Sequence, residues 1–382
     1  MKDLAIYIHI PFCYSKCYYC DFCSYPNRYD IRDKYIDYLK REIDIYARKI
    51  SSHHNVKTIF IGGGTPSYIE GRYIHELLNH IYKKFDVSNL EEVTIESNPK
   101  TLDEEKLKIY KESGINRISL GLQTMNDSLL KEIGRIHTSK DFLETFELVR
   151  KQGFDNVNAD IMFNLPNQKV KDVEDSLIKI IDLGIEHISF YSLKVEEGTP
   201  FHKRNEKGNL NLPSEDTERE MYHHGINILE ENGYKHYEIS NFAKKGFQCQ
   251  HNLFYWKLKP YIGLGMAAHS NINSERYGNV IDFKEYFTSI DNGNLPIDLE
   301  NKEIIDREME MAEYMILGLR LLDGINKLQF YNRFGVTLEN AIGSSVLSKL
   351  EKQGLLIVGN QNIKLTRRGA DLSNQVFMEL LP

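Results

Sequence analysis

The 382-residue sequence lacks an apolar run of the ~20 residues that a membrane-spanning helix needs. Its early hydrophobic stretch, Leu4–Phe12, is too short for a secretory signal and has neither a basic flank nor a small-residue cleavage site. An excess of positive charge is also missing, since 48 lysines and arginines stand against 55 aspartates and glutamates, a formal net charge of −7. The sequence therefore predicts a cytoplasmic protein and argues against a nucleic-acid partner.

Cysteine is scarce as well, but it is concentrated. Four of the five cysteines, Cys13, Cys17, Cys20 and Cys23, fall within eleven residues. The reducing cytoplasm disfavours disulfides, so this clustering indicates a metal or redox site. The fifth, Cys249, is expected to be an ordinary buried thiol.

The chain has no low-complexity tract and no solenoid repeat; instead, β-rich runs alternate with amphipathic helical patterns. The predicted strands are 5–10, 56–62, 92–97, 116–123, 156–163 and 187–193. Six βα units in a row predict an α/β fold with a parallel sheet covered by helices. Right-handed crossovers would leave this sheet open or curl it into a barrel.

Three regions are predicted along the chain. Residues 1–235 form the barrel, 236–300 a loop-rich aromatic extension, and 301–382 a C-terminal domain. Helices, a hairpin over 355–366 and a closing helix over 367–381 indicate a helical, winged-helix-like domain. Packing or partner docking is its favoured role, because the acidic chain argues against DNA.

The cysteine spacing C-x3-C-x2-C admits two kinds of metal site. A zinc site needs four ligands, and Cys23 could supply the fourth. A 4Fe–4S cluster held by three thiolates instead leaves one iron free to chelate the methionine group of S-adenosylmethionine. Electron transfer to the sulfonium then yields a 5′-deoxyadenosyl radical. The second site is favoured, because the cysteines follow the first strand and GGGTPS (62–67) follows the second.

Polar residues also mark the later strands. Glu96 lies at the end of the third strand, Gln123 at the end of the fourth, and Asp160 on the fifth. Alone, each could be a solvated rim residue or a helix cap. Consecutive strand ends that meet at one mouth favour a ligand site.

These motifs resemble the radical S-adenosylmethionine superfamily. Within it, the chain is similar to the oxygen-independent coproporphyrinogen III oxidases and their HemW-type heme-chaperone relatives. The resemblance covers nearly the whole length and rests on YIHIPFC, GGGTPS, ESNP, RISLGLQ, GRIHT, YEISNF, HNLFYW and LTRRGADLSNQVF. It implies a partial (β/α)6 barrel with the cluster on Cys13, Cys17 and Cys20. It also implies that S-adenosylmethionine contacts Tyr7, Tyr19, Gly63, Gly64, Thr65, Glu96, Gln123, Arg135 and Asp160.

The resemblance further implies heme as a ligand. In HNLFYW (251–256), His251 or Tyr255 could ligate iron and Trp256, the only tryptophan, could stack on the macrocycle. Packing of aromatic side chains over the barrel mouth explains the motif equally well. His9 is either a further site residue or a core histidine.

Two functions follow from the resemblance. A heme chaperone would hand heme to an acceptor protein, whereas an oxidase would decarboxylate coproporphyrinogen III to protoporphyrinogen IX. The chaperone is favoured, because Phe22 stands at the oxidases' fourth cysteine and HNLFYW belongs to the chaperone branch. Only twelve residues precede Cys13, so no N-terminal arm over the active site is expected. Oxidase activity is therefore not expected.

Three points stay open from the sequence. These are the identity of the acceptor and whether it is membrane-associated, whether the protein forms a homodimer, and whether S-adenosylmethionine is cleaved in the working cycle. A zinc-holding DNA-binding protein is the third functional class.

Overall fold

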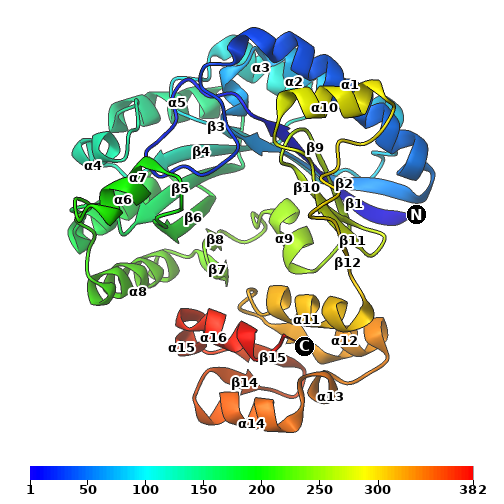
Figure 1. The fold of residues 1–382 in the computed structure, drawn as a ribbon. Coiled ribbons are helices and arrows are strands. Elements are labelled where there is room, and N and C mark those ends of the chain that lie inside the picture. The colour runs from blue at the N-terminus through cyan, green and yellow to red at the C-terminus, as the bar shows by residue number, and fades with distance from the viewer. Residues whose placement is uncertain (382) are drawn as a thin grey trace.

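The computed structural model describes residues 1–381, and its centre is a curved sheet of six parallel strands (Figure 1). In order these are β1 (Lys2–Ile10), β2 (His54–Gly63), β3 (Glu92–Ser97), β4 (Arg117–Gln123), β5 (Val157–Phe163) and β6 (His187–Ser192). Helices cover its outer face: α1 (Arg32–Ile50), α2 (Gly71–Lys84), α3 (Glu104–Glu112), α4 (Asp127–Glu132), α5 (Ser139–Lys151) and α6 (Val170–Asp182). The predicted partial (β/α)6 barrel is confirmed.

The sequence pattern explains these elements. On α1, buried side chains recur every three or four residues, at Tyr35, Leu39, Ile43, Tyr46 and Ile50, and this spacing gives one apolar face. All of β4 is buried, as expected for a strand covered on both sides. Short 3-10 helices, η1 (Tyr29–Ile31), η2 (Ser51–His53) and η3 (Pro66–Tyr68), complete the connections.

Six further strands extend the sheet at both edges. β9 (Tyr261–Leu264) pairs in parallel with β1, and β10 (His269–Ile272), β11 (Glu275–Gly278) and β12 (Glu303–Ile304) follow antiparallel. At the other edge, β8 (Asn241–Ala243) pairs with β6 and β7 (Lys235–Glu238) pairs with β8. α7 (Pro200–Glu206) and α8 (Glu215–Glu231) precede this edge.

Residues 236–300 are therefore more regular than the sequence indicates. Besides these short strands, they contain α9 (Gln250–Trp256), which lies inside the curve of the sheet, and α10 (Phe283–Asp291) (Figure 1). Strands of three or four residues are too short to show a clear alternation, so the sequence pattern resembles loops.

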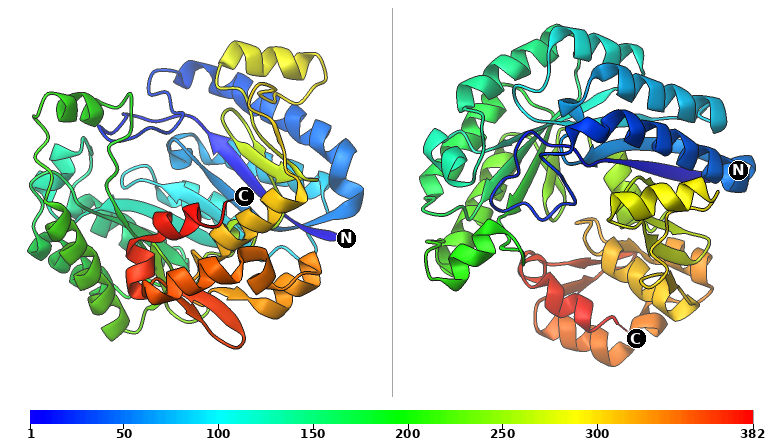
Figure 2. Two further views of the ribbon diagram at one scale, coloured as in Figure 1. Left: turned by 60° about the horizontal axis from the view of Figure 1, so that its bottom comes forward. Right: turned by 45° about the horizontal axis from the view of Figure 1, so that its top comes forward.

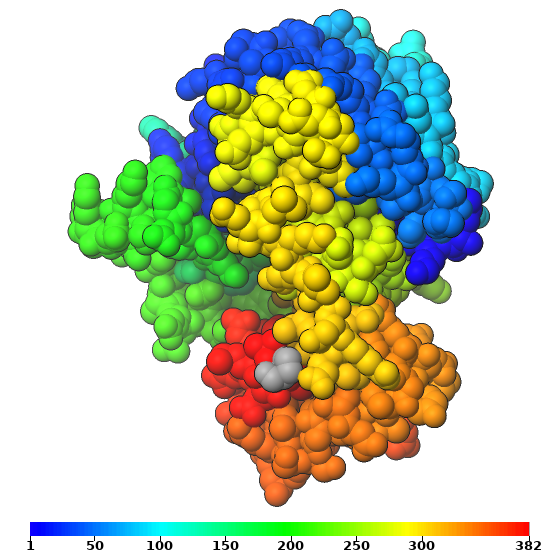
Figure 3. Space-filling view, turned by 45° about the vertical axis from the view of Figure 1, so that its right-hand side comes forward, coloured from blue at the N-terminus to red at the C-terminus, as the bar shows by residue number. Residues whose placement is uncertain are grey.

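The C-terminal domain has its own core and forms a separate lobe below the barrel (Figure 3). Its helices are α11 (Arg307–Gly318), α12 (Lys327–Phe334), α13 (Leu338–Ile342) and α14 (Ser344–Lys352). β13 (Ile325–Asn326), β15 (Asn362–Leu365) and β14 (Leu356–Val358) form a small sheet. The predicted closing helix is two helices, α15 (Arg367–Asp371) and α16 (Ser373–Met378), because the backbone of Leu372 leaves the helical region.

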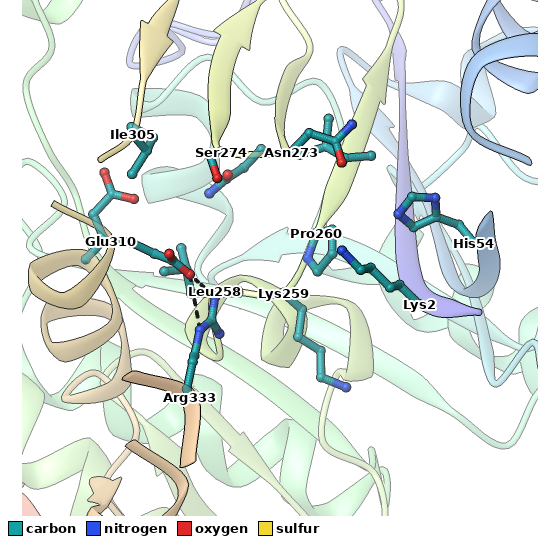
Figure 4. Close-up of a pocket in the computed structure, with 13 residues that line it drawn as sticks. Lys2, His54, Leu258, Lys259, Pro260, Asn273, Ser274, Ile305, Glu310 and Arg333 are labelled. Atoms are coloured by element: carbon teal, nitrogen blue, oxygen red, sulfur yellow. Dashed lines mark hydrogen bonds and ion pairs between the residues drawn. The ribbon is translucent and has the colours of Figure 1, made fainter. Parts of the chain in front are cut away.

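Backbone hydrogen bonds join this domain to the barrel. The Ile239 amide donates to Arg320 O at 3.2 Å, and the Leu322 amide donates to Tyr237 O at 3.1 Å. A polar cleft of about 200 Å³ lies at the same junction, with Arg333 and Glu310 on one side and Lys2 and His54 on the other (Figure 4). Because Lys2 and His54 begin β1 and β2, this cleft lies at the end of the barrel opposite the cysteines.

Among residues 1–381, no helix combines the length and the apolar character needed to cross a membrane.

Candidate functional site: two cavities beside the cysteine loop

The cysteine loop (residues 11–28) leaves the end of β1 and crosses the mouth of the curved sheet (Figure 2). The loop after β2 holds it by its backbone. The Gly64 amide donates to Ile10 O at 2.9 Å, and the Thr65 amide donates to Phe12 O at 2.8 Å. A Cβ atom on Gly64 would lie 2.8 Å from Phe12 O and 2.9 Å from Cys13 Sγ. The glycine is thus required for the close approach that positions Cys13.

The other side of the loop is held from the far half of the barrel. The Tyr18 amide donates to Ile133 O at 3.1 Å, and the Phe201 amide donates to Tyr18 O at 3.0 Å. Arg135 Nη1 lies 3.5 Å from Cys17 Sγ. The loop is therefore fixed by contacts from β2, α4 and α7.

The first cavity, here called the cysteine cavity, has a volume of about 340 Å³. The predicted residues that line it are Cys13, Cys17, Cys20, Tyr19, Gly63, Gly64, Thr65, Glu96, Gln123, Arg135 and Asp160. The thiols are spread along the wall: within residues 1–381, no three His, Cys, Asp or Glu side chains converge as ligands of a single ion. The structure thus brings three of the four clustered cysteines to the strand-end residues.

Strand ends form the floor of the cysteine cavity. Glu96 comes from β3, Gln123 from β4, Asp160 from β5 and Tyr191 from β6, and the Tyr191 hydroxyl donates to Gln123 Oε1 at 3.2 Å. Gln123 has a φ of 76°, in a region that non-glycine residues rarely adopt, where the pairing of β4 with β5 shifts register. Such local strain is typical of functional sites.

Two buried carboxyl groups share this floor. Burial, reinforced by the nearby Asp160, raises the pKa of Glu96 to about 8, and burial also raises the pKa of Asp160. Three of the lining residues also carry a buried polar atom, Ser97 Oγ, Asn241 Oδ1 and Arg135 Nε, that finds no hydrogen-bond partner within residues 1–381. A ligand rich in hydroxyl, amino and carboxylate groups suits this lining, which offers two buried carboxyl groups and the Arg135 guanidinium.

Sequence analysis missed part of this lining. Asn98, Ser119, Tyr191, Asn241 and Asn252 line the cysteine cavity but received no role. All five had a sequence signal: Asn98 lies in ESNP, Ser119 in RISLGLQ, Asn241 in YEISNF and Asn252 in HNLFYW, and Tyr191 lies on the predicted sixth strand. In the structure Asn98 accepts a hydrogen bond from Arg135. Asn252 brings the HNLFYW motif to this cavity.

The second cavity, here called the aromatic cavity, has a volume of about 710 Å³ and lies on the other side of the cysteine loop. Its principal lining residues are Tyr7, His9, Phe22, Cys23, Tyr255, Trp256, Tyr261, His269, Asn271, Arg276, Glu313 and Leu317. Tyr7 was grouped with the cofactor residues by resemblance, yet it lines this cavity, as does the fourth clustered cysteine, Cys23.

His9 ties β1 to the cysteine loop. Its Nδ1 lies 3.1 Å from the Tyr7 hydroxyl, and its Nε2 lies 2.8 Å from the carbonyl oxygen of Cys23. Burial lowers the pKa of His9 to about 4, so the ring is neutral at physiological pH. Gly63, with a φ of 112°, makes room for it, because a Cβ there would lie 2.6 Å from the ring.

His251 is equally engaged. Only 1% exposed, it places Nδ1 2.9 Å from Thr58 Oγ1 and Nε2 2.8 Å from the Tyr255 hydroxyl. Burial lowers the pKa of His251 to about 3. Trp256 lies at the other end of α9, and the Arg320 guanidinium covers its ring at 4.4 Å from the centroid. Both histidines predicted for heme thus have both ring nitrogens in hydrogen bonds.

A partial barrel with three cysteines after its first strand defines the radical S-adenosylmethionine class. The model of the Radical SAM superfamily matches residues 7–180, and that of the HemN C-terminal domain matches residues 305–372. The structure is similar to that of coproporphyrinogen III oxidase (HemN) from Escherichia coli. The TM-score is 0.86 at 21% identity, over 99% of this chain and 90% of that one, a similarity of fold.

Sequence comparison narrows the class to one family. The chain is 40% identical to the heme chaperone HemW of Bacillus subtilis, covering 98% of each chain. It is 37% identical to the heme chaperone HemW of Lactococcus lactis, covering 100% of this chain and 98% of that one. The chain therefore belongs to the HemW heme chaperone family.

Proposed function

We propose that this protein is a heme chaperone that binds heme, passes it to an acceptor protein, and carries a 4Fe–4S cluster and S-adenosylmethionine. The observation that carries the proposal is the cysteine loop between two cavities. Cys13, Cys17 and Cys20 line one cavity, Cys23 lines the other, and Phe22 borders both. One short segment thus joins a site suited to the cluster and its cofactor with a site suited to a large aromatic ligand.

In the cysteine cavity, Cys13, Cys17 and Cys20 would hold the cluster. When bound, such a cluster supplies an open iron that chelates S-adenosylmethionine and an electron that can cleave it. Arg135 suits the carboxylate of the cofactor, because its guanidinium is already oriented by Asn98 and the Gly121 carbonyl. Glu96 and Asp160 suit hydroxyl donors of the ribose, because both are buried carboxyl groups in the cavity lining with further acceptor capacity beyond the hydrogen bonds from the Gly63 amide and Asn158 Nδ2.

The aromatic cavity would hold heme. Its volume of about 710 Å³ lies within the range of about 300–1,000 Å³ that is typical of ligand sites. Rings of Tyr7, Tyr255, Trp256 and Tyr261 line it, and a flat apolar macrocycle packs well on such rings. Phe22 is 62% exposed at its edge, which suits cargo that must leave for an acceptor.

The C-terminal domain would help to retain heme and to dock the acceptor. Glu313 and Leu317 of α11 contribute to the wall of the aromatic cavity, so this domain borders the cargo. An acceptor that contacts the domain would therefore meet heme at the same edge.

Two anaerobic assays on one preparation test the proposal. The reconstituted protein is titrated with heme, and it is separately incubated with coproporphyrinogen III, S-adenosylmethionine and a reductant. We expect saturable binding with a defined absorption band in the first assay and no protoporphyrinogen in the second. Catalytic release of carbon dioxide from coproporphyrinogen III would replace the chaperone by the oxidase. Absence of saturable heme binding would refute the chaperone.

A further inference from the structure

We propose that His269, on β10, is the protein ligand of the heme iron in the aromatic cavity. This inference rests on the proposed function, because it assigns a ligand to a heme that the chaperone would carry. A neutral imidazole binds heme iron through one ring nitrogen, so the residue must offer an unoccupied nitrogen at the cavity surface.

The hydrogen bonding of its ring nitrogens distinguishes His269 from the two histidines that the sequence predicts for heme. His9 and His251 have both ring nitrogens engaged, and each lies in a buried network. Coordination by either ring would break a buried hydrogen bond, which typically costs about a tenfold or greater loss of affinity. The His269 ring is exposed, lines the aromatic cavity, and makes no hydrogen bond or ion pair with any of residues 1–381.

Strand register leaves space beside this ring. In the antiparallel β10–β11 hairpin, His269 pairs with Gly278, and Asn271 pairs with Arg276. Directly paired residues share a face of the sheet, so the imidazole has no side chain opposite it. A Cβ on Gly278 would lie 3.1 Å from His269 Cε1, 3.4 Å from Nε2 and 3.5 Å from Nδ1, so the imidazole lies close over the glycine. A larger residue at position 278 would crowd both ring nitrogens, so the glycine leaves the imidazole room to lie on the hairpin.

The remaining walls suit the macrocycle that His269 would hold. Tyr255, Trp256 and Tyr261 supply aromatic surface to the same cavity, and Phe22 supplies an exposed ring from the cysteine loop. The Tyr255 and Tyr261 rings are T-shaped, with centroids 4.6 Å apart, which makes this wall rigid. The iron would thus be held on the hairpin side, with the porphyrin against aromatic rings.

Cys23 is the competing ligand, because its thiol also lines the aromatic cavity. Unlike the His269 ring, this thiol has a hydrogen-bond partner within the protein, because Cys23 Sγ lies 3.5 Å from the Tyr25 hydroxyl. An imidazole ligand and a thiolate ligand give distinct heme spectra, so the two can be told apart experimentally.

The test is an anaerobic titration of hemin into the full-length, cluster-reconstituted protein, followed by difference absorption and electron paramagnetic resonance spectroscopy. His269→Ala is expected to weaken binding by about tenfold or more, as loss of a metal-site residue typically does. It should also shift the heme band, and added imidazole should restore the band position. His269→Gln is the second variant. Iron content and S-adenosylmethionine binding should stay unchanged in both, which shows that they fold.

Two control variants sharpen the result. His53→Ala removes an exposed histidine next to β2, at the end of the barrel opposite the cysteines, and should leave the heme spectrum unchanged. Cys23→Ser should keep the imidazole-type spectrum. An unchanged spectrum and affinity in His269→Ala would overturn the inference, as would loss of the heme band in Cys23→Ser alone. If the unsubstituted protein binds no heme, the proposed function itself fails.

Discussion

The two cavities beside the cysteine loop are built in different ways. The cysteine cavity is made by strand ends and by loops hydrogen-bonded through their backbones, such as those of Gly64 and Thr65. The aromatic cavity is made by side chains from β1, α9, the β9–β11 edge and α11, which meet only in the folded chain. The first construction suits the resident cluster and cofactor proposed for it, and the second suits the heme cargo proposed to enter and leave.

The largest expected effect separates the two cavities through their cysteines. Cys13→Ala, Cys17→Ala or Cys20→Ala should abolish the broad visible absorption of the anaerobically reconstituted cluster, because each removes one of the three thiolate ligands that we propose. Cys23→Ala is the matched control and should retain iron and sulfide, since its thiol lines the other cavity. Equal loss of the cluster in Cys23→Ala would show that all four thiols serve one metal site.

The next largest effect is expected from the substitution of Gly64, which should lower the cluster content. In Gly64→Ala the new Cβ would press on Phe12 O and Cys13 Sγ, and overpacking of this kind typically destabilises by about 1–3 kcal/mol. We expect Gly64→Ala to incorporate much less cluster, measured as iron per chain.

Gly71→Ala is the control for that substitution. Its Cβ would meet only the flexible side chain of Ile109, at 3.3 Å, so cluster content should be unchanged. Full cluster content in Gly64→Ala would mean that the two loops can separate without harm, contrary to a rigid cysteine cavity.

Loss of a strand-end side chain should weaken cofactor binding. Asp160→Ala or Gln123→Ala removes a polar contact, worth ~1–3 kcal/mol, so the affinity for S-adenosylmethionine should fall about 5–150-fold while iron content is kept. Equilibrium dialysis or calorimetry with reconstituted protein measures it. Tyr7→Phe offers the contrast, because Tyr7 lines the aromatic cavity and should affect heme more than S-adenosylmethionine.

How much of this could be predicted from the sequence also differs between the cavities. Cys13 and Gly64 belong to motifs that follow strand ends, and Asp160 lies on β5; parallel strands bring these positions together, so the motifs were sufficient to predict the lining of the cysteine cavity. The sequence motifs were not sufficient to predict the lining of the aromatic cavity. The placement of His269 depends on pairing of the four-residue strand β9 with β1, far away in sequence, and on the register of β10 with β11. Neither pairing leaves a periodic pattern in the sequence, so the sequence predicts heme contacts in the HNLFYW motif and gives no signal for His269.

Glu42 offers the smallest expected effect, and it tests how the wall of the aromatic cavity is anchored. This fully buried carboxyl group of α1 accepts hydrogen bonds from the Gly265 amide at 2.8 Å, Asn279 Nδ2 at 2.8 Å and the Tyr286 hydroxyl at 2.6 Å. Gly265 follows β9 and Asn279 follows β11, so the Glu42 side chain holds the segments after both strands of the β9–β11 edge.

The pH dependence has a definite sign. Burial raises the pKa of Glu42 from its ordinary 4.5 to about 7, so between these values the folded chain keeps a proton that the unfolded chain releases. The contribution of Glu42 to the free energy of unfolding should thus be greatest below pH 4.5 and decline until about pH 7, by at most about 3 kcal/mol. Denaturant unfolding at several pH values should show a steeper decline for the unsubstituted protein than for Glu42→Gln. Parallel pH profiles would show that the carboxyl stays ionised, held by its three donors, and that the edge strands are anchored by charge.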